Sequence, residues 1–243
     1  MDVTLSGKQI LVTGGTSALG RIFVRRALEE GAAVFFTYHQ NTHEASCLAQ
    51  LGAKGFQVDL AKRAEIDQLK KQIQSYTRAL DAIVQNAATV RDHTIQNLTE
   101  SEWDEVLGVD LDSVYYLIKR FLSFLFKKPG SRILNVVSRA GLQGGFGIAN
   151  YAAAKGGLIA LTKSLAREIG KKQVLVNALN PGFMKSHMTQ RIPEQAFRQN
   201  IEESVLGTIS DPEAVADFMI YLLSDRFRGV SGQIFHFDSR GTN

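Results

Sequence analysis

The feature that most constrains the fold of this chain is an alternation of two hydrophobic patterns along its 243 residues. Short apolar runs rich in β-branched residues predict strands, and their unbroken apolar character is typical of strands buried on both faces. Longer amphipathic stretches between them predict helices. The predicted strands span residues 9–13, 33–38, 55–59, 82–85, 132–137, 174–179 and 233–237, and the predicted helices span residues 19–30, 42–51, 63–76, 100–126, 150–170 and 212–223. Such alternation builds right-handed crossover units, so we expect an α/β fold with a doubly wound, mostly parallel sheet and helices on both faces.

Helix-capping signals and chain length agree with this organisation. Thr99 and Glu102 form a capping-box pattern, and Asp211 is an N-cap candidate before Pro212, which suits a first helical turn. The chain can bury one large core, and open α/β sheets of this length are commonly single domains. We therefore expect one domain over residues 1–243, in which the long polar stretch 182–210 is a mobile lid over the substrate.

The first predicted strand runs into a glycine-rich turn that suits a phosphate group. The turn reads Thr13-Gly14-Gly15-Thr16-Ser17-Ala18-Leu19-Gly20, and an amphipathic helix follows it. Glycines let a backbone approach a pyrophosphate closely, and a helix N-terminus offers free N–H groups and the positive end of a dipole. The turn therefore predicts a dinucleotide site in a Rossmann-type fold, with a tight turn that holds no ligand as the alternative for this motif alone.

Tyr151 and Lys155 lie four residues apart in a predicted helix, so their side chains share one face. A free tyrosine has a pKa of about 10, and a neighbouring ammonium favours the ionised phenolate. The pair suits proton transfer, whereas an ordinary solvated helix face is the simpler interpretation of this spacing without other motifs.

Further motifs follow in order along the chain: Asp59-Leu60 after the third predicted strand, Asn86-Ala87-Ala88 after the fourth, Ser138 after the fifth and Asn180-Pro181-Gly182 after the sixth. With the glycine turn and Tyr151-Ala152-Ala153-Ala154-Lys155, they resemble the motifs of the short-chain dehydrogenase/reductase family over essentially the whole chain. Arg91-Asp92, Lys163-Ser164-Leu165-Ala166-Arg167-Glu168 and Pro181-Gly182-Phe183 make the likeness closest to 3-oxoacyl-acyl-carrier-protein reductases. The resemblance implies an oxidoreductase that reduces the ketone of a 3-oxoacyl thioester.

The resemblance also implies a cofactor site. The backbone around Gly14, Gly15, Thr16, Ser17 and Leu19 would hold the pyrophosphate, Asp59 and Leu60 would contact adenine, Asn86 would line the cleft, and Met184 and Ser186 would lie near the nicotinamide amide.

The end of the second predicted strand bears on the choice between NADPH and NADH. It reads Thr37-Tyr38-His39-Gln40 and carries no acidic residue to accept the ribose hydroxyls of NAD. Candidate hydrogen-bond donors to a 2′-phosphate are Thr16, Ser17, Thr37 and His39, with weak help from Arg21. We therefore expect NADPH, although the basic residue that many NADP-dependent relatives carry at the position of Ser17 is missing.

For catalysis, the resemblance implies that Tyr151 protonates the developing alkoxide and that Ser138 hydrogen-bonds the same oxygen. Lys155 would tune Tyr151 and anchor the nicotinamide ribose. Gln143 and Asn150 are candidates for lining the substrate pocket. The family's catalytic asparagine aligns with Asp110, whose carboxylate can pair with Lys155 or disturb the proton relay; we expect activity to be retained.

The distribution of charge indicates the class of partner. The net charge is +4, but the basic residues form no Lys/Arg block or aromatic-interleaved stripe, so we expect no nucleic-acid partner. We expect a small-molecule substrate or one bound to acyl carrier protein. Candidates for attracting an acidic carrier beside the cleft are Arg120, Lys127, Lys128, Arg139, Lys171 and Lys172, with scattered surface charge as the alternative. Relatives usually assemble through the long helices, here residues 100–126 and 150–170, which implies a homotetramer.

Several absent patterns narrow the function further. No run of about 18 apolar residues and no signal-peptide pattern occurs, so we expect a cytoplasmic protein without a membrane segment. The histidines lack metal-ligand spacing, so we expect no metal, and Cys47 is expected to be a reduced, half-buried thiol. Two alternatives stay open. One is a dehydrogenase of another secondary alcohol, such as a sugar, steroid or small alcohol; the other is a cofactor-binding sensor or scaffold with little turnover, which Ala18, Ala88 and Asp110 motivate.

Overall fold

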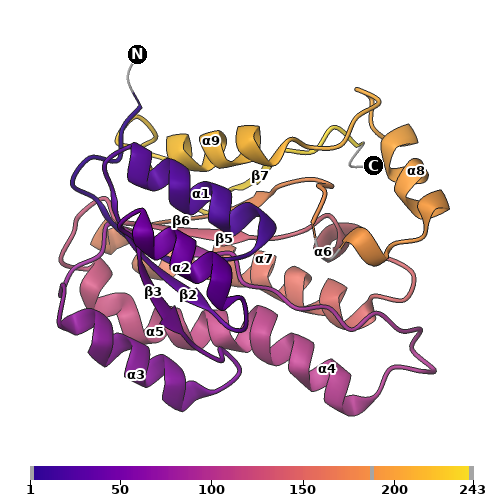
Figure 1. Ribbon diagram of the computed structural model, residues 1–243, viewed down its shortest axis with the longest axis horizontal. Helices are drawn as coiled ribbons and strands as arrows, with labels where there is room; N and C mark the ends of the chain where they lie inside the picture. Colours follow the sequence, from indigo (N-terminus) through magenta and orange to yellow (C-terminus); the bar gives the residue numbers. More distant parts are fainter. Residues whose placement is uncertain (1–2, 187–188, 241–243) are drawn as a thin grey trace.

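The computed structural model describes residues 3–186 and 189–240 and contains a seven-stranded parallel sheet in the order β3-β2-β1-β4-β5-β6-β7 (Figure 1). The strands are β1 (Gln9–Thr13), β2 (Ala33–Tyr38), β3 (Lys54–Gln57), β4 (Ala82–Gln85), β5 (Arg132–Val136), β6 (Leu175–Asn180) and β7 (Ile234–His236). Every predicted strand is present, with ends that differ by two residues at most. The expected doubly wound, Rossmann-type architecture is therefore confirmed.

Helices cover both faces of this sheet (Figure 1). They are α1 (Ala18–Glu29), α2 (Thr42–Gln50), α3 (Arg63–Gln74), α4 (Glu100–Leu107), α5 (Ser113–Leu125), α6 (Ala140–Gln143), α7 (Ala149–Ile169), α8 (Glu194–Glu202) and α9 (Pro212–Leu223). Helices α1, α2 and α9 contribute to the hydrophobic core on one face, and α3, α5 and α7 contribute to the core on the other. Among the described residues, no helix is both long and apolar enough to cross a membrane.

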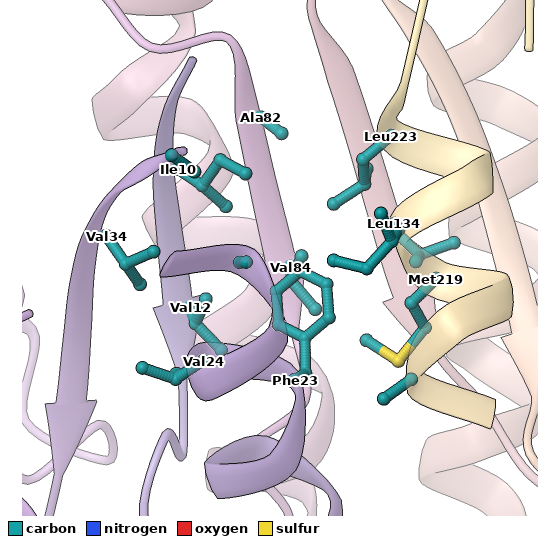
Figure 2. Packing of buried hydrophobic residues seen from close by; sticks show 14 of the residues in the cluster. Ile10, Val12, Phe23, Val24, Val34, Ala82, Val84, Leu134, Met219 and Leu223 are labelled. Atoms are coloured by element: carbon teal, nitrogen blue, oxygen red, sulfur yellow. The ribbon is translucent and has the colours of Figure 1, made fainter. Parts of the chain in front are cut away.

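The core beneath α1 and α9 fixes the position of the glycine turn. Figure 2 shows Val12, Val84 and Leu134 of the sheet directed toward Phe23 of α1 and Met219 of α9. All five side chains are buried, and removing one such side chain from water contributes about 1.5–3 kcal/mol. Because this packing holds α1 firmly against the sheet, the turn that joins β1 to α1 has a fixed position.

The strand order explains where a site can form. From β1 the chain proceeds outward through β2 and β3, and then returns to β4 on the other side of β1. The connections after β1 and β4 therefore leave in opposite directions, which opens a crevice beyond the carboxyl ends of these two strands. Residues that follow the strands lie along this edge, which we call the carboxyl edge. The opposite amino edge lies at the beginnings of the strands.

The predicted helix 100–126 is in fact two helices joined by a π-helical segment, η1 (Gly108–Asp112). The Ser113 hydroxyl donates to the Val109 carbonyl at 2.6 Å, which satisfies one backbone group in this widened turn. Hydrophobic periodicity did not reveal the segment because the apolar pattern continues through it. Asp110 lies within it and is completely buried.

The predicted lid, residues 182–210, has more regular structure than we expected. It contains a short 3₁₀ turn, η3 (Thr189–Arg191), and α8. No residue of α8 is buried, so the helix lacks the core-facing apolar stripe that makes a helix conspicuous in a sequence. His187 and Met188 of the predicted lid lie outside the described residues.

Candidate active site

The glycine turn is held from beneath by β2. The Gly14 N–H donates to the Thr37 hydroxyl at 3.2 Å, and the Gly15 N–H donates to the Thr37 carbonyl at 2.8 Å. Gly14 has a φ of +64°, and a Cβ on this residue would lie 2.8 Å from the Ala87 Cα. A side chain at Gly14 would therefore strain the turn and press against the backbone that follows β4.

Asn86 and Thr13 bind the turn to the end of β4. The Asn86 amide nitrogen donates to the carbonyls of Thr13 and Gly14 at 3.1 and 2.9 Å, and lies 3.0 Å from the Ser17 hydroxyl. The Thr13 hydroxyl accepts from the backbone N–H groups of Asn86 and Ala87 at 3.0 and 3.1 Å. Asn86 was predicted to line the cleft, and its amide here clamps the turn. No separate role was predicted for Thr13, whose side chain is buried.

The start of α1 fits a pyrophosphate. The Ser17 hydroxyl caps the helix by accepting from the Gly20 N–H at 3.1 Å. The N–H groups of Ala18 and Leu19 are bonded to no acceptor within the described residues. These two donors and the positive end of the helix dipole face the crevice edge, so the residues present suit the phosphates of a dinucleotide. The Leu19 side chain itself is buried in the core.

The remaining predicted cofactor contacts lie along the same edge in different surroundings. Thr37 is buried, and its hydroxyl is occupied in accepting from the turn, whereas His39 is exposed just beyond β2. The Asp59 carboxylate accepts from the Ala61 N–H at 3.1 Å and pairs with Lys62 at 3.2 Å. Leu60 is only 8% exposed. Thr37 therefore supports the glycine turn, and Asp59 shapes the turn after β3.

Tyr151, Lys155, Ser138 and Asp110 meet beside this crevice. Lys155 and Tyr151 share one face of α7, and the Lys155 Nζ lies 5.5 Å from the centre of the Tyr151 ring. The same Nζ lies 3.1 Å from Asp110 Oδ2 and donates to the Val136 carbonyl at 3.3 Å. The Ser138 side chain is close enough to the Tyr151 phenol to lower its pKa. The predicted i, i+4 pairing and the alternative in which Asp110 pairs with Lys155 are both present.

The Asp110–Lys155 ion pair is buried. The side chains of Asp110 and Lys155 are 0% and 3% exposed. The second carboxylate oxygen, Asp110 Oδ1, accepts from the Thr89 N–H at 2.7 Å. This bond joins the π-helical segment to the loop after β4, so the carboxylate is held from two directions.

Burial and charge act against each other within this group. Burial raises the pKa of the Tyr151 phenol, and the Asp110 carboxylate adds to that rise; Lys155 and Ser138 act in the other direction without cancelling it. Burial lowers the pKa of Lys155, but the charges of Asp110 and Tyr151 outweigh it, so the net pKa is above the usual value. Burial also raises the pKa of Asp110 more than Lys155 lowers it. Lys155 therefore acts on the phenol in the predicted direction, while the phenol itself remains a weaker acid than a free tyrosine.

Asn150 supports the start of this helix rather than lining a pocket. It is completely buried, and its amide nitrogen donates to the Arg91 carbonyl at 2.9 Å. Its side-chain oxygen accepts from the Tyr151 N–H at 2.8 Å. Asn150 therefore links the loop after β4 to the residue that carries the phenol.

The segment predicted to be a lid contacts Arg139, the residue after Ser138, through Glu203. Arg139 Nη1 lies 2.6 Å from Glu203 Oε2, directly after α8, and Arg139 Nε donates to Gln143 Oε1 at 2.5 Å. Nearer the start of the lid, the Ser186 N–H donates to the Thr189 hydroxyl at 2.7 Å, and this hydroxyl donates to the Met184 carbonyl at 2.9 Å. Met184 and Ser186 thus belong to one tight turn after β6.

The predicted placement of most carrier-binding candidates beside the cleft was wrong. Lys127 and Lys128 follow α5 directly before β5, and Lys171 and Lys172 lie in η2 (Gly170–Lys172) directly before β6. These four lysines therefore lie at the amino edge, opposite the site. Arg120 pairs with Asp67 of α3 at 2.6 Å, and Arg139, which does lie at the carboxyl edge, is already paired with Glu203. Their place directly before two predicted strands already indicated the amino edge, but the candidates were chosen by charge alone.

Comparisons with known proteins agree with this geometry. The family model described as Enoyl-(Acyl carrier protein) reductase matches residues 14–241. The 3-oxoacyl-[acyl-carrier-protein] reductase FabG of Vibrio harveyi is 32% identical over 236 residues, which cover 96% of this chain and 97% of the relative. The reductase of the same name from Thermotoga maritima is 32% identical over 240 residues, with coverage of 96% and 97%.

Solved structures share the fold over nearly the whole chain. RhlG of Pseudomonas aeruginosa, in an NADP active-site complex, is 26% identical with a TM-score of 0.91, and the match covers 98% of each chain. A short-chain dehydrogenase/reductase from Serratia marcescens is 29% identical with a TM-score of 0.90, covering 98% of this chain and 99% of that one.

Proposed function

We propose, from the fact that the chain belongs to the short-chain dehydrogenase/reductase family, that it reduces the ketone of a 3-oxoacyl thioester carried by acyl carrier protein. The observation that carries the proposal is the meeting of Tyr151, Lys155 and Ser138 beside the crevice at the carboxyl ends of β1 and β4. Curated relatives about one-third identical over nearly the whole chain act on such substrates according to their names.

Tyr151 is the proton donor in this proposal. Its raised pKa keeps the phenol protonated through the neutral range, which suits a group that must deliver a proton to an alkoxide. The Ser138 side chain acts on the phenol and is proposed to hydrogen-bond the substrate oxygen beside it. As the carbonyl carbon accepts a hydride, the carbonyl π electrons move to oxygen and the phenol proton follows, giving a secondary alcohol.

A nicotinamide cofactor supplies that hydride when it is bound. The chain's own contribution is the glycine turn with the free N–H groups of Ala18 and Leu19, which would hold the pyrophosphate. Lys155 would anchor the nicotinamide ribose while its charge acts on Tyr151. Met184 and Ser186, in the turn after β6, are proposed to contact the nicotinamide amide.

We infer NADPH as the preferred form of this cofactor. The end of β2 offers the exposed His39 and no carboxylate that would repel a 2′-phosphate. Thr16 and the Ser17 hydroxyl lie on the neighbouring turn, and Arg21, half exposed one turn into α1, lies 3.8 Å from Glu44. The test is equilibrium binding: NADPH should bind tighter than NADH, and Arg21→Gln should weaken NADPH more than NADH. Equal affinity for the two cofactors would contradict the inference.

The test of the reaction is loss of reduced-nicotinamide absorbance with acetoacetyl thioester. Tyr151→Phe should lower turnover by about 10²–10⁴-fold with cofactor affinity retained, because only the proton donor is removed. Tyr76→Phe is the matched control, since this tyrosine is 55% exposed directly after α3, away from the site. Full turnover in Tyr151→Phe would reject Tyr151 as the acid.

A second candidate is reduction of the carbon–carbon double bond of an enoyl thioester, which the description of the matched family favours. Crotonyl and acetoacetyl thioesters, each compared on acyl carrier protein and on a short thiol, separate the two reactions and the role of the carrier. A sugar, a steroid and a small secondary alcohol complete the panel. Cofactor binding without turnover on any of these substrates would support a sensor or scaffold.

Assembly and location are proposals too. The outward surface of α5 carries Tyr115 and Phe126, which are 47% and 39% exposed and are suited to contact another copy of the chain. We propose a homotetramer through α4, α5 and α7 in the cytoplasm, testable by light scattering and cell fractionation.

A further inference from the structure

We propose that Asp110 is a positioning residue that favours reduction over oxidation, because its buried carboxylate holds the Lys155 ammonium and offsets the positive charge that Lys155 brings to the Tyr151 phenol. The proposal rests on the proposed role of Tyr151 as general acid. It assigns to Asp110 control over the direction of proton transfer, without contact between Asp110 and the substrate.

Asp110 is held against Lys155 in the protein interior. Asp110 is reachable neither from solvent nor from the crevice, since it is 0% exposed, yet it lies 3.1 Å from the Lys155 Nζ. Its other oxygen is fixed by the Thr89 N–H at 2.7 Å. A carboxylate held in this way cannot turn toward water, so its charge acts on Lys155 and on whatever surrounds Lys155. The nearest titratable group on α7 is Tyr151, with its ring 5.5 Å from the same Nζ.

Charged groups reach the Tyr151 phenol from several elements. The groups that act on the phenol are Lys155 of α7, Asp110 of the π-helical segment, Asp92 of the loop after β4 and the neutral Ser138 of the loop after β5. Asp92 is itself faced by His93. One cation is thus opposed by two carboxylates, of which Asp110 touches the cation and Asp92 does not.

The sign of the charge on Asp110 decides which protonation state of the phenol is favoured. A negative charge near a phenol disfavours the phenolate, and a buried pair transmits this effect more strongly than an exposed one. Reduction needs the protonated phenol, and oxidation of the alcohol needs the phenolate. Asp110 therefore keeps the Tyr151 phenol protonated to a higher pH. The phenolate, which serves oxidation, forms only above that pH.

The experiment titrates the phenol directly in four proteins without cofactor or substrate: the parent, Tyr151→Phe, Asp110→Asn and the double variant. Six tyrosines ionise in the chain, so the ultraviolet phenolate signal of Tyr151 is obtained by subtracting the Tyr151→Phe spectrum in each background. Asparagine keeps a side-chain oxygen for the Thr89 N–H while it removes the charge. Asp112→Asn, two residues further along the same segment and exposed, is the matched control.

We expect Asp110→Asn to move the Tyr151 titration down by about one pH unit, and Asp112→Asn to leave it in place. The pH profile of 3-hydroxyacyl thioester oxidation should move in the same direction, so that kcat for oxidation with saturating substrates, measured at a fixed pH below the midpoint of the profile, rises up to about tenfold. An unchanged or raised Tyr151 titration in a variant that melts as a folded protein would overturn the proposal. Because the titration needs no substrate, its result is independent of whether acetoacetyl thioester is reduced.

Discussion

Two buried cations at opposite edges of the sheet are stabilised in different ways. Lys155, near the carboxyl edge, has a side chain 3% exposed and faces the fully buried Asp110 at 3.1 Å. Arg132, which begins β5 at the amino edge, has a side chain 7% exposed, and its acidic partner Asp225 is 82% exposed. Arg132 instead donates to the carbonyls of Gly130, Ser224 and Phe227 at 2.8, 2.9 and 3.0 Å.

The difference indicates that Arg132 has a structural role, whereas the surroundings of Lys155 suit a role in proton transfer. Burial lowers the pKa of Arg132, and Asp225 does not compensate, whereas Asp110 brings the pKa of Lys155 above its usual value. Carbonyl groups satisfy the donors of Arg132 and thereby tie the loop after α9 to the start of β5. A buried carboxylate fixes Lys155 and keeps it charged beside a phenol. The amino edge thus uses its buried cation to join segments of chain, and the carboxyl edge is suited to use its own to tune a proton.

The largest effect that would sharpen this contrast is expected from Lys155→Met. The substitution leaves the Asp110 carboxylate buried without its counter-charge, so we expect unfolding free energy to fall by about 3–5 kcal/mol at neutral pH. Asp110 already has a raised pKa in the folded protein, and loss of Lys155 raises it further. The folded state then binds a proton that the unfolded state releases at neutral pH, so the penalty should shrink as pH falls toward about 5. Urea unfolding at several pH values measures both effects.

Adding Asp110→Asn to Lys155→Met should restore much of the lost stability, because no unpaired charge remains in the core. Lys163→Met, on an exposed position of the same helix, is the matched control and should be close to neutral. A Lys155→Met penalty that is small and insensitive to pH would show that the buried pair does not differ from an ordinary surface pair.

Arg132→Met should give the complementary result at the amino edge. It removes the donors from buried carbonyls, so we expect about 2–3 kcal/mol of destabilisation. Turnover of the folded variant should stay within about twofold of the parent, since the active site lies at the other edge of the sheet. Arg228→Met, exposed on the same edge, controls for loss of a positive charge. A large fall in turnover at full folding would break the division of roles between the edges.

The strands, the carboxyl edge and the pairing of Tyr151 with Lys155 could be predicted from the sequence. Continuous apolar runs predict strands that are buried on both faces. In a parallel sheet, the residue after each strand then lies at the carboxyl edge. Gly14 was predicted from the glycine-rich turn after the first strand, and Asn86 and Ser138 from the family resemblance of the residues that follow two later strands; the i, i+4 spacing predicted that Tyr151 and Lys155 share a face.

What the sequence did not reveal depends on contacts between distant segments. The burial of Asp110 requires the π-helical turn, which leaves no mark in hydrophobic periodicity. The clamp by Asn86 and the anchoring of Asn150 to the Arg91 carbonyl join residues far apart in the chain. The four lysines at the amino edge were assigned to the cleft by their charge, although their place directly before two predicted strands indicated the opposite edge.

A third cation, Arg139, tests whether burial or location decides the size of such effects. Arg139 lies at the carboxyl edge like Lys155, but its side chain is 22% exposed and its partner Glu203 is 40% exposed. Water and salt screen this pair. We therefore expect Glu203→Gln to weaken the attachment of residues 182–210 to Arg139 by about 0.2–1 kcal/mol. We expect the KM for a 3-oxoacyl thioester to rise no more than about fivefold, with kcat retained and the rise shrinking at high salt. Glu202→Gln, on the adjacent exposed residue, is the control. If Glu203→Gln instead lowered kcat as strongly as removal of Lys155, proximity to the site rather than burial of the charge would govern the electrostatics of this edge.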